Sequence, residues 1–304
     1  MIFPSLSMAD YVSDSLGDPR PALSASAAHT LLARSPRHAW HAHPKLNPAW
    51  QRHEEAKFDL GTAIHAIALG DNGTTFDVIA GYDDWRKNEA KDRRDAARAA
   101  GRLPLLEHQY NEAKEAVDSL RQQLALHEIG NPFSAGAPEV TLTWEMDGVL
   151  CKARLDWMPP AREGDVCFYD LKSTTDSANP MLADRRLDAT GCYLQAAFHS
   201  AGIVANFPAV RPRFAFILLE VDQPYAMSVV EPDAVGLEMA QQDVARAVAL
   251  WKRCLSEDRW PGYPSRVCTL DTAAWKIGRA EERAAVETRE AADGVDAFAA
   301  AMVW

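Results

Sequence analysis

The chain has 304 residues, of which 47% are hydrophobic and 25% charged, ordinary values for a globular protein with one large core. It contains no apolar run of about 18 residues, which excludes a typical membrane-spanning helix. The net charge of −11 is unfavourable for binding polyanions, because phosphate contacts need Lys and Arg.

The five cysteines are odd in number and widely spaced, and none forms a CxxC pair. This pattern argues against a zinc ribbon or an iron–sulfur cluster and suits a reducing compartment. The first twenty residues also lack the basic region and apolar core of a secretory signal. We therefore expect a cytoplasmic protein without an iron–sulfur cofactor and without a membrane association.

The N-terminal half predicts mainly helices. Residues 1–22 contain three prolines and a glycine and predict an arm without a firm element. Either Ser24 or Ser26 can cap the first helix. The predicted helices cover residues 24–33, 58–69, 86–100 and 105–128, with irregular structure over 37–56.

Charge is unevenly distributed in this half. Residues 86–102 contain seven basic and three acidic residues, a local excess of four positive charges. A run of this kind is most often a solvated helix face. The run by itself therefore neither establishes nor excludes a polyanionic partner.

Strands dominate after Pro138. Residues 139–158 predict two strands joined at Asp147-Gly148, a pair typical of hairpin turns. The elements expected next are a strand at 165–174, a helix at 188–201 closed by Gly202, a central strand at 212–221 and a long amphipathic helix at 231–257. This order predicts an α/β fold with a central mixed β-sheet flanked by helices and a helical N-terminal region.

Three parts are expected along the chain: the arm (1–22), a core domain (23–264) and a helical tail (265–304). The tail is rich in Ala and Glu and ends in the apolar segment FAAAMVW. This segment can dock on a neighbouring subunit, dock on a partner or cover its own core, and the sequence leaves these possibilities open.

Charged residues alternate in the two strands around residue 160. Alternation places Asp170 and Lys172 on one face of their strand, and Asp156 on one face of the preceding strand. If these strands form a hairpin, both carboxylates come within reach of one ion. With the Leu171 carbonyl they would fill half of the octahedral oxygen shell of Mg²⁺, for which Mn²⁺ can substitute.

Lys172 can orient or help deprotonate a water molecule and offset charge on a phosphate transition state. The same spacing also fits alternating charges on a solvated strand face. The opposite face of this strand is apolar, with Cys167, Tyr169 and Leu171, so the strand is packed and the site is favoured.

Six segments in this order resemble the RecE-type (exodeoxyribonuclease VIII-like) exonucleases of phages and prophages: GTAIHAIAL, PEVTLTW, GVLCKARLDWM, VCFYDLKST, GCYLQAAFHSAG and WPGYP. That group belongs to the PD-(D/E)XK nuclease superfamily, with RecB nuclease domains and phage lambda exonuclease. The resemblance extends from about Leu23 to Pro264. It implies a restriction-endonuclease-like core that hydrolyses linear double-stranded DNA with Mg²⁺, from 5′ to 3′, leaving 3′ overhangs for recombination by strand annealing.

The resemblance also implies roles for single residues beyond the triad of Asp156, Asp170 and Lys172. His65 would join the metal shell, Glu139 would act where the hairpin opens, and Gln195 would hold substrate and the active-site strands. Each has an ordinary structural alternative: a core histidine, a surface glutamate and a glutamine that bridges backbone.

One departure and several candidate DNA contacts complete the comparison. The family usually has Tyr four residues after the glutamine, where this chain has His199. Ser26 resembles the serine that holds the 5′ phosphate in the lambda branch, and equally fits a helix N-cap. The other candidates for DNA contact are Arg34, Arg37 and Tyr193.

The partners that the resemblance implies are double-stranded DNA ends, a single-strand annealing protein and further copies of the chain in a ring-shaped trimer or tetramer. Two alternatives remain: a structure-specific or sequence-specific endonuclease on the same core, and an inactive DNA-end-binding or assembly protein. The chain offers no separate recognition domain, which disfavours a restriction enzyme. The intact triad disfavours an inactive protein.

Overall fold

The computed structural model describes residues 1–51, 59–70 and 74–292. The chain divides into two compact units, Met1–Gly262 and Tyr263–Trp304. In the second unit, α10 (Ala274–Ala292) is the described helix, and the apolar segment FAAAMVW lies outside the described residues. In the described part of the chain, no helix has the length and apolar character needed to cross a membrane.

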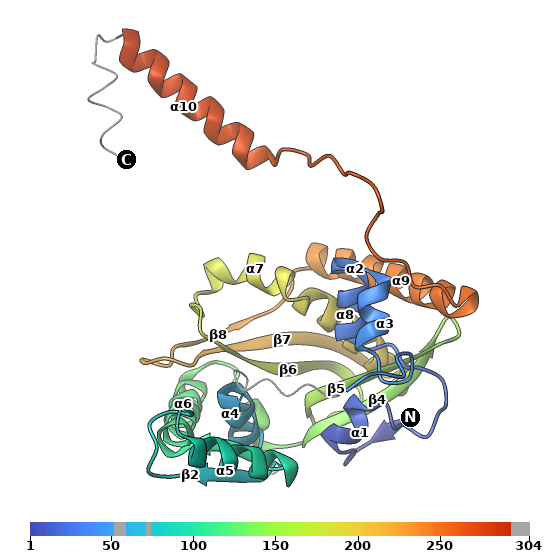
Figure 1. The fold of residues 1–304 in the computed structure, drawn as a ribbon, viewed down its shortest axis with the longest axis vertical. Helices are drawn as coiled ribbons and strands as arrows, with labels where there is room; N and C mark the ends of the chain where they lie inside the picture. Colours follow the sequence, from blue (N-terminus) through green and yellow to red (C-terminus); the bar gives the residue numbers. More distant parts are fainter. Residues whose placement is uncertain (52–58, 71–73, 293–304) are drawn as a thin grey trace. The chain divides into compact units, whose positions relative to one another are not determined.

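The strands of the first unit form three hydrogen-bonded sheets (Figure 1). The first sheet has the order β1 (Ile2–Phe3), β4 (Ala137–Met146), β5 (Val149–Met158). The second pairs β2 (Phe76–Ile79) with β3 (Leu103–Leu106) in parallel. The third has the order β6 (Gly164–Thr174), β7 (Val210–Glu220), β8 (Met227–Val230), with β6 and β7 parallel and β7 and β8 antiparallel.

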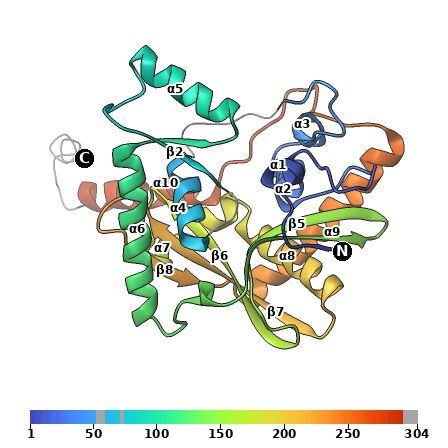
Figure 2. The same ribbon diagram turned by 90° about the horizontal axis from the view of Figure 1, so that it is seen from below.

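Helices cover both faces of the third sheet (Figures 1 and 2). One layer contains α2 (Ala25–Ala33), α3 (Pro36–Ala42), α7 (Pro180–Ala189), α8 (Cys192–Asn206) and α9 (Ala234–Glu257). The opposite layer contains α4 (Asp59–Leu69), α5 (Asn88–Ala99) and α6 (Glu107–Leu126). The short helix α1 (Met8–Val12) lies beside the first sheet, and a 3₁₀ turn spans Pro132–Ser134. The predicted α/β class, with sheets flanked by helices, is confirmed.

β6 is buried on both faces because each face packs into a different hydrophobic core. Val166 and Phe168 belong to the larger core, with residues of α2, α8 and α9. Leu171 belongs to the smaller core, with residues of α4 and α6. Since side chains alternate along a strand, Asp170 and Lys172 must face the same side as Phe168. The strand therefore buries Asp170, while the Lys172 side chain remains 33% exposed.

The turn between β4 and β5 follows the prediction, because Asp147 and Gly148 have φ of 49° and 79°, as a two-residue hairpin turn requires. Gly202 differs from its prediction, since it lies within α8 and does not end it. A Cβ atom at Gly202 would lie 2.6 Å from the Trp144 ring. This glycine therefore permits close packing of α8 on β4.

Several short elements were not predicted: β1, α1, α3, β2, β3, α7 and β8. The segment 1–22, expected to be an arm, contains two of them and lies in the first compact unit. Ile2 and Phe3 pair with Leu142 and Thr141 of β4, and the Met1 ammonium donates a hydrogen bond to the Thr143 carbonyl at 2.6 Å. Such short elements depend on tertiary contacts, which local periodicity does not report.

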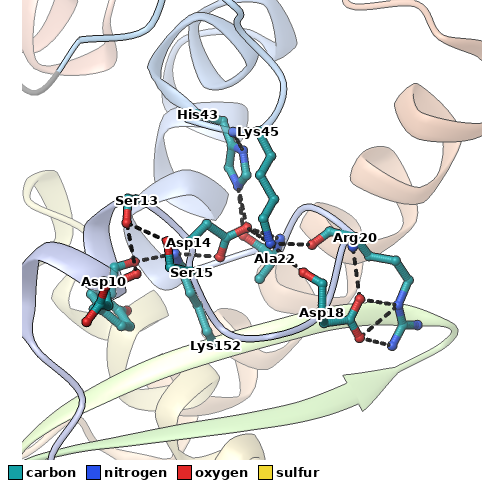
Figure 3. A network of polar contacts seen from close by, with 11 residues as sticks. Asp10, Ser13, Asp14, Ser15, Asp18, Arg20, Ala22, His43, Lys45 and Lys152 are labelled. Carbon is teal, nitrogen blue, oxygen red and sulfur yellow. Dashed lines mark hydrogen bonds and ion pairs between the residues drawn. The ribbon is translucent and has the colours of Figure 1, made fainter.

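A buried polar network holds this N-terminal segment to the rest of the unit (Figure 3). Asp14 is fully buried, and its carboxylate lies 2.8 Å from Lys152 Nζ and 3.3 Å from Lys45 Nζ. The Ala22 amide donates to the same carboxylate at 2.9 Å, and His43 lies 3.7 Å away. Burial lowers the pKa of Lys152, and the Asp14 charge opposes that effect. Asp14 is thus the counter-charge for a buried lysine.

Asp14→Asn is expected to lower the free energy of unfolding by about 3 kcal/mol, because it leaves the Lys152 ammonium buried without its counter-charge. Asn tolerates the left-handed backbone of Asp14, whose φ is 60°, so the change removes charge without adding backbone strain. Urea unfolding followed by circular dichroism measures the effect. The matched control is Asp18→Asn in the same segment, where the exposed pair with Arg20 contributes little. Equal midpoints for the two variants would contradict the assigned role of Asp14.

Candidate active site

Asp156 on β5 and Asp170 on β6 meet at the junction of two sheets. The two strands do not pair in a hydrogen-bonded ladder, so the expected hairpin is replaced by a side-chain link. The Leu171 amide donates a hydrogen bond of 2.8 Å to Asp156 Oδ2. This bond draws the Asp156 carboxylate to the backbone between Asp170 and Lys172.

Asp170 is only 1% exposed and has a different partner on each oxygen. Gln195 Nε2, from α8, donates to Oδ1 at 2.6 Å. Lys172 Nζ lies 2.5 Å from Oδ2, and no other described residue donates a hydrogen bond to that oxygen. The amide and the ammonium together fix the orientation of the carboxylate.

His65 lies against Asp156 and Leu171 from the opposite layer. Its Nε2 is 3.1 Å from Asp156 Oδ2 and 2.8 Å from the Leu171 carbonyl oxygen. Four residues earlier, a Cβ atom at Gly61 would lie 2.8 Å from Ser173 Oγ. The absence of a side chain at Gly61 therefore lets α4 approach β6 closely, which brings His65 to the site.

Glu139 stands opposite Asp156 at an interruption of the β4–β5 ladder. Pro138 pairs with Trp157 and Val140 pairs with Leu155, but Glu139 itself has φ of 56°. A non-glycine residue in the left-handed region is sterically costly and is often found at functional sites. The Glu139 carboxylate forms an ion pair with Arg154 and lies 3.9 Å from His65 Nδ1.

The charges of this cluster perturb one another strongly. Burial and the Asp156 charge raise the pKa of Asp170 to about 6, against the opposing effect of Lys172. Burial lowers the pKa of His65, but the Asp156 charge and hydrogen bond outweigh burial and raise it to about 9. Burial disfavours the ammonium of Lys172, and the Asp170 and Asp156 charges still raise its pKa above the ordinary value. Such mutual perturbation in a cleft is typical of functional sites.

The donor set fits a hard divalent cation. Two carboxylates and the Leu171 carbonyl are oxygen ligands of the kind that Mg²⁺ or Mn²⁺ accepts, and the His65 imidazole could join them after losing its proton. Asp170 Oδ2, with Lys172 as its only close partner among the described residues, is a buried anionic atom suited to a cation. As the described side chains stand, no group of three or more His, Cys, Asp or Glu residues has metal-binding spacing. The oxygens are instead drawn to Lys172 and His65.

A cleft of about 2080 Å³ opens over this cluster. Its lining includes every predicted catalytic and metal-binding residue except the buried Asp170: His65, Glu139, Asp156, Leu171, Lys172 and Gln195. The N-terminal segment, the start of α2, Trp50 and the turn at Gly101-Arg102 form other parts of the walls. A pocket for a small molecule measures about 300–1,000 Å³, so this cleft has room for a macromolecular substrate.

The candidate DNA contacts do not all line the cleft. Ser26 lines the cleft. Ser24 is the N-cap of α2, accepting a hydrogen bond from the Ala27 amide at 3.2 Å, so the N-cap alternative for Ser26 is wrong. Arg34 and Tyr193 are absent from the described lining, and the Tyr193 hydroxyl donates to Asp184.

Arg37 is also absent from the described lining of the cleft. Its backbone amide donates to the Pro261 carbonyl, and its side chain packs beside Gly262. His199 does line the cleft, one turn beyond Gln195, and packs edge-on against Phe214. Burial and the nearby Lys172 charge lower the pKa of His199 to about 3, so its imidazole is neutral.

Two features of the site were missed by sequence reasoning. The ion pair between Arg154 and Glu139 follows from the alternation that places Arg154 and Asp156 on one face, a signal available in the sequence. The cleft wall at Arg98 and Arg102 belongs to the basic run at 86–102, whose position relative to the site only the fold reveals.

Residues 26–271 match the family described as a PDDEXK-like domain of unknown function (DUF3799). No curated protein sequence matches the chain. The crystal structure of a candidate exonuclease from Eubacterium rectale has a TM-score of 0.56 at 13% identity, covering 90% of this chain and 97% of that one, which shows similarity of fold alone.

A second solved structure, that of SSO0001, has a TM-score of 0.27 at 14% identity, covering 70% of this chain and 97% of that one. The family match extends over most of the chain and includes each residue of the cluster at Asp156, Asp170 and Lys172. The chain therefore belongs to the family of PDDEXK-like domains.

Proposed function

We propose that this protein is a metal-dependent nuclease that hydrolyses phosphodiester bonds of DNA in the cleft. The observation that carries the proposal is the convergence of Asp156, Asp170 and Lys172 beneath one large cleft, with Asp156 hydrogen-bonded to the Leu171 amide. Two carboxylates that can hold a divalent cation, beside a lysine that can offset phosphate charge, suit metal-dependent phosphodiester hydrolysis. Membership of the PDDEXK-like family supports the same reaction.

Asp156, Asp170, the Leu171 carbonyl and His65 would hold a divalent cation, with Mg²⁺ as the expected ion and Mn²⁺ as a substitute. When bound, such a cation supplies hydroxide near neutral pH and offsets charge on the scissile phosphate. Gln195 keeps the Asp170 carboxylate oriented, and the Leu171 amide does the same for Asp156.

Lys172 contributes as an ammonium in this arrangement. With its pKa raised by two carboxylates it retains its proton, so it donates to an attacking water or to a phosphate oxygen. The Glu139–Arg154 pair borders the same part of the cleft. Arg154 pairs with Glu139, whose backbone is left-handed, and Glu139 adds a further carboxylate near His65.

We further propose that the substrate is the end of linear double-stranded DNA and that degradation proceeds from 5′ to 3′, leaving 3′ overhangs. The resemblance of six ordered segments to RecE-type exonucleases supports this choice, together with Ser26 in the cleft wall as a candidate 5′-phosphate contact. A single-strand annealing partner and a ring of three or four copies belong to the same proposal.

Incubation with Mg²⁺ and equal amounts of linear and circular duplex DNA tests the proposed function. Loss of the linear form alone is the expected result, and release of a 5′ label before a 3′ label would support the proposed direction. Nicking or cutting of circles would favour an endonuclease on the same core. No cleavage of either form, with retained binding to ends, would favour an inactive end-binding protein.

A further inference from the structure

A stripe of basic residues follows one side of α5. Lys87, Lys91, Arg94 and Arg98 occur at positions i, i+4, i+7 and i+11. Lys87 is the N-cap residue of α5, and at 100° per residue the three helical residues Lys91, Arg94 and Arg98 lie within about 60° of one another around the helix axis. Glu89 and Asp92 fall on the far side, whereas Asp95 lies about 40° from Lys91 and pairs with Arg94 at 2.8 Å. We call these four basic residues the α5 stripe.

The α5 stripe is held in place by local contacts. Ala90 and Ala97 are fully buried and hold α5 against the β2–β3 pair. Arg94 stacks over the Trp85 ring at 5.8 Å, and Lys87 over the Tyr82 ring at 5.6 Å. These ring contacts limit the conformations of the Lys87 and Arg94 side chains. Binding a ligand therefore costs less side-chain entropy at these two residues.

One end of the stripe enters the cleft. Arg98, at the last turn of α5, lines the cleft, and so does Arg102 just beyond the helix. The same cleft contains Lys172 and Asp156. Figure 2 shows α5 at the outer edge of its layer, away from β7. If α5 presented only a solvated face, its cations would have no reason to line up with the cleft.

The dimensions and charge fit double-stranded DNA. From residue 87 to residue 98 a helix extends for about 16 Å, the length of roughly five base pairs at 3.4 Å each. The chain carries a net charge of −11, which repels phosphate, whereas residues 86–102 carry an excess of four positive charges. The segment is therefore a place where a duplex backbone can approach a mostly acidic protein.

We infer that the α5 stripe binds the phosphate backbone of double-stranded DNA and guides the duplex into the cleft. This inference rests on the proposed nuclease function. It adds an element that acts on the uncut duplex, outside the cluster of Asp156, Asp170 and Lys172. Phosphate contacts of this kind bind without regard to sequence, as an enzyme that degrades DNA from an end requires.

The test is the salt dependence of duplex binding by Lys87→Gln/Lys91→Gln. Fluorescence anisotropy with a labelled duplex of about 30 base pairs, in EDTA to prevent cleavage, gives affinity between about 50 and 200 mM salt. Each lost phosphate contact reduces the slope of log affinity against log salt by about 0.9, so we expect a reduction of about 2. The matched control is Arg86→Gln/Arg93→Gln, which removes the same charge from the same segment outside the stripe.

A wild-type slope in the stripe variant, or an equal loss in the control, would overturn the inference. A loss of binding confined to single-stranded DNA of the same length would also overturn it. Thermal melting checks that both variants are folded. The stripe variant should fold normally, because Lys87 and Lys91 are exposed. Cleavage of linear DNA by the wild-type protein is scored separately. If cleavage is seen and the slope does not change, the stripe inference fails and the proposed function stands.

Discussion

Lys172→Ala is expected to abolish detectable cleavage of linear duplex DNA, with a rate loss of about a thousandfold or more. The ammonium lies 2.5 Å from Asp170 Oδ2 at the cleft wall, where it can offset charge that develops on the phosphate. DNA binding should remain within a few-fold of wild type, because many other groups line the cleft. Single-turnover cleavage and anisotropy, measured on the same duplex, separate the two effects.

The control for this variant is Lys252→Ala. Lys252 lies on α9, is half-exposed and pairs with Asp147 on the surface. The substitution removes the same charge outside the cluster of Asp156, Asp170 and Lys172, and it should leave the cleavage rate unchanged. A near-normal rate in Lys172→Ala would show that the assigned role is wrong.

Asp170→Asn is expected to weaken Mn²⁺ binding and cleavage together. The change keeps the shape of the side chain and its acceptor for Gln195, but removes one of two anionic ligands. Removing a group that only supports a metal ligand typically lowers metal affinity roughly 10- to 100-fold. Removing the charge of a ligand itself should lower the Mn²⁺ affinity by at least as much. Titration calorimetry with Mn²⁺ measures it, and gel-based cleavage at saturating Mn²⁺ measures the remaining activity.

Asp165→Asn is the matched control on the same strand. Its carboxylate is 70% exposed and pairs with Arg211, so the substitution tests loss of one aspartate charge on β6 away from the site. Metal affinity should be unchanged. If Asp170→Asn binds Mn²⁺ with the affinity of the control, Asp170 is not a ligand.

Much of the fold was predictable because its signals are local. The hairpin at Asp147-Gly148, the strand at 165–174 and the long helix ending at Glu257 follow from turn chemistry and from periods of two and 3.6 residues. Alternation also places Asp170 and Lys172 on one face without any knowledge of the fold. By contrast, β2, β3 and β8 are four-residue strands whose stability depends on neighbours.

The relative positions of the site residues were beyond local reasoning. His65 and Leu171 are 106 residues apart, and their contact depends on the close approach of α4 to β6 at Gly61. The left-handed backbone of Glu139 likewise has no signal in its residue type. The resemblance to RecE-type exonucleases implied a role for both His65 and Glu139, but only the packing of the fold determines where their side chains lie.

By itself, the sequence determined the α/β class and the alternation that presents Asp170 and Lys172 together. The alternation follows from side-chain direction along a strand, which covalent geometry dictates. Only the tertiary structure decided that Asp156 reaches the Leu171 amide across two separate sheets, that residues 1–22 pack through Asp14, and that the basic run at 86–102 ends in the cleft. Each of these depends on contacts between distant segments, which hydrophobic burial selects and no local period encodes.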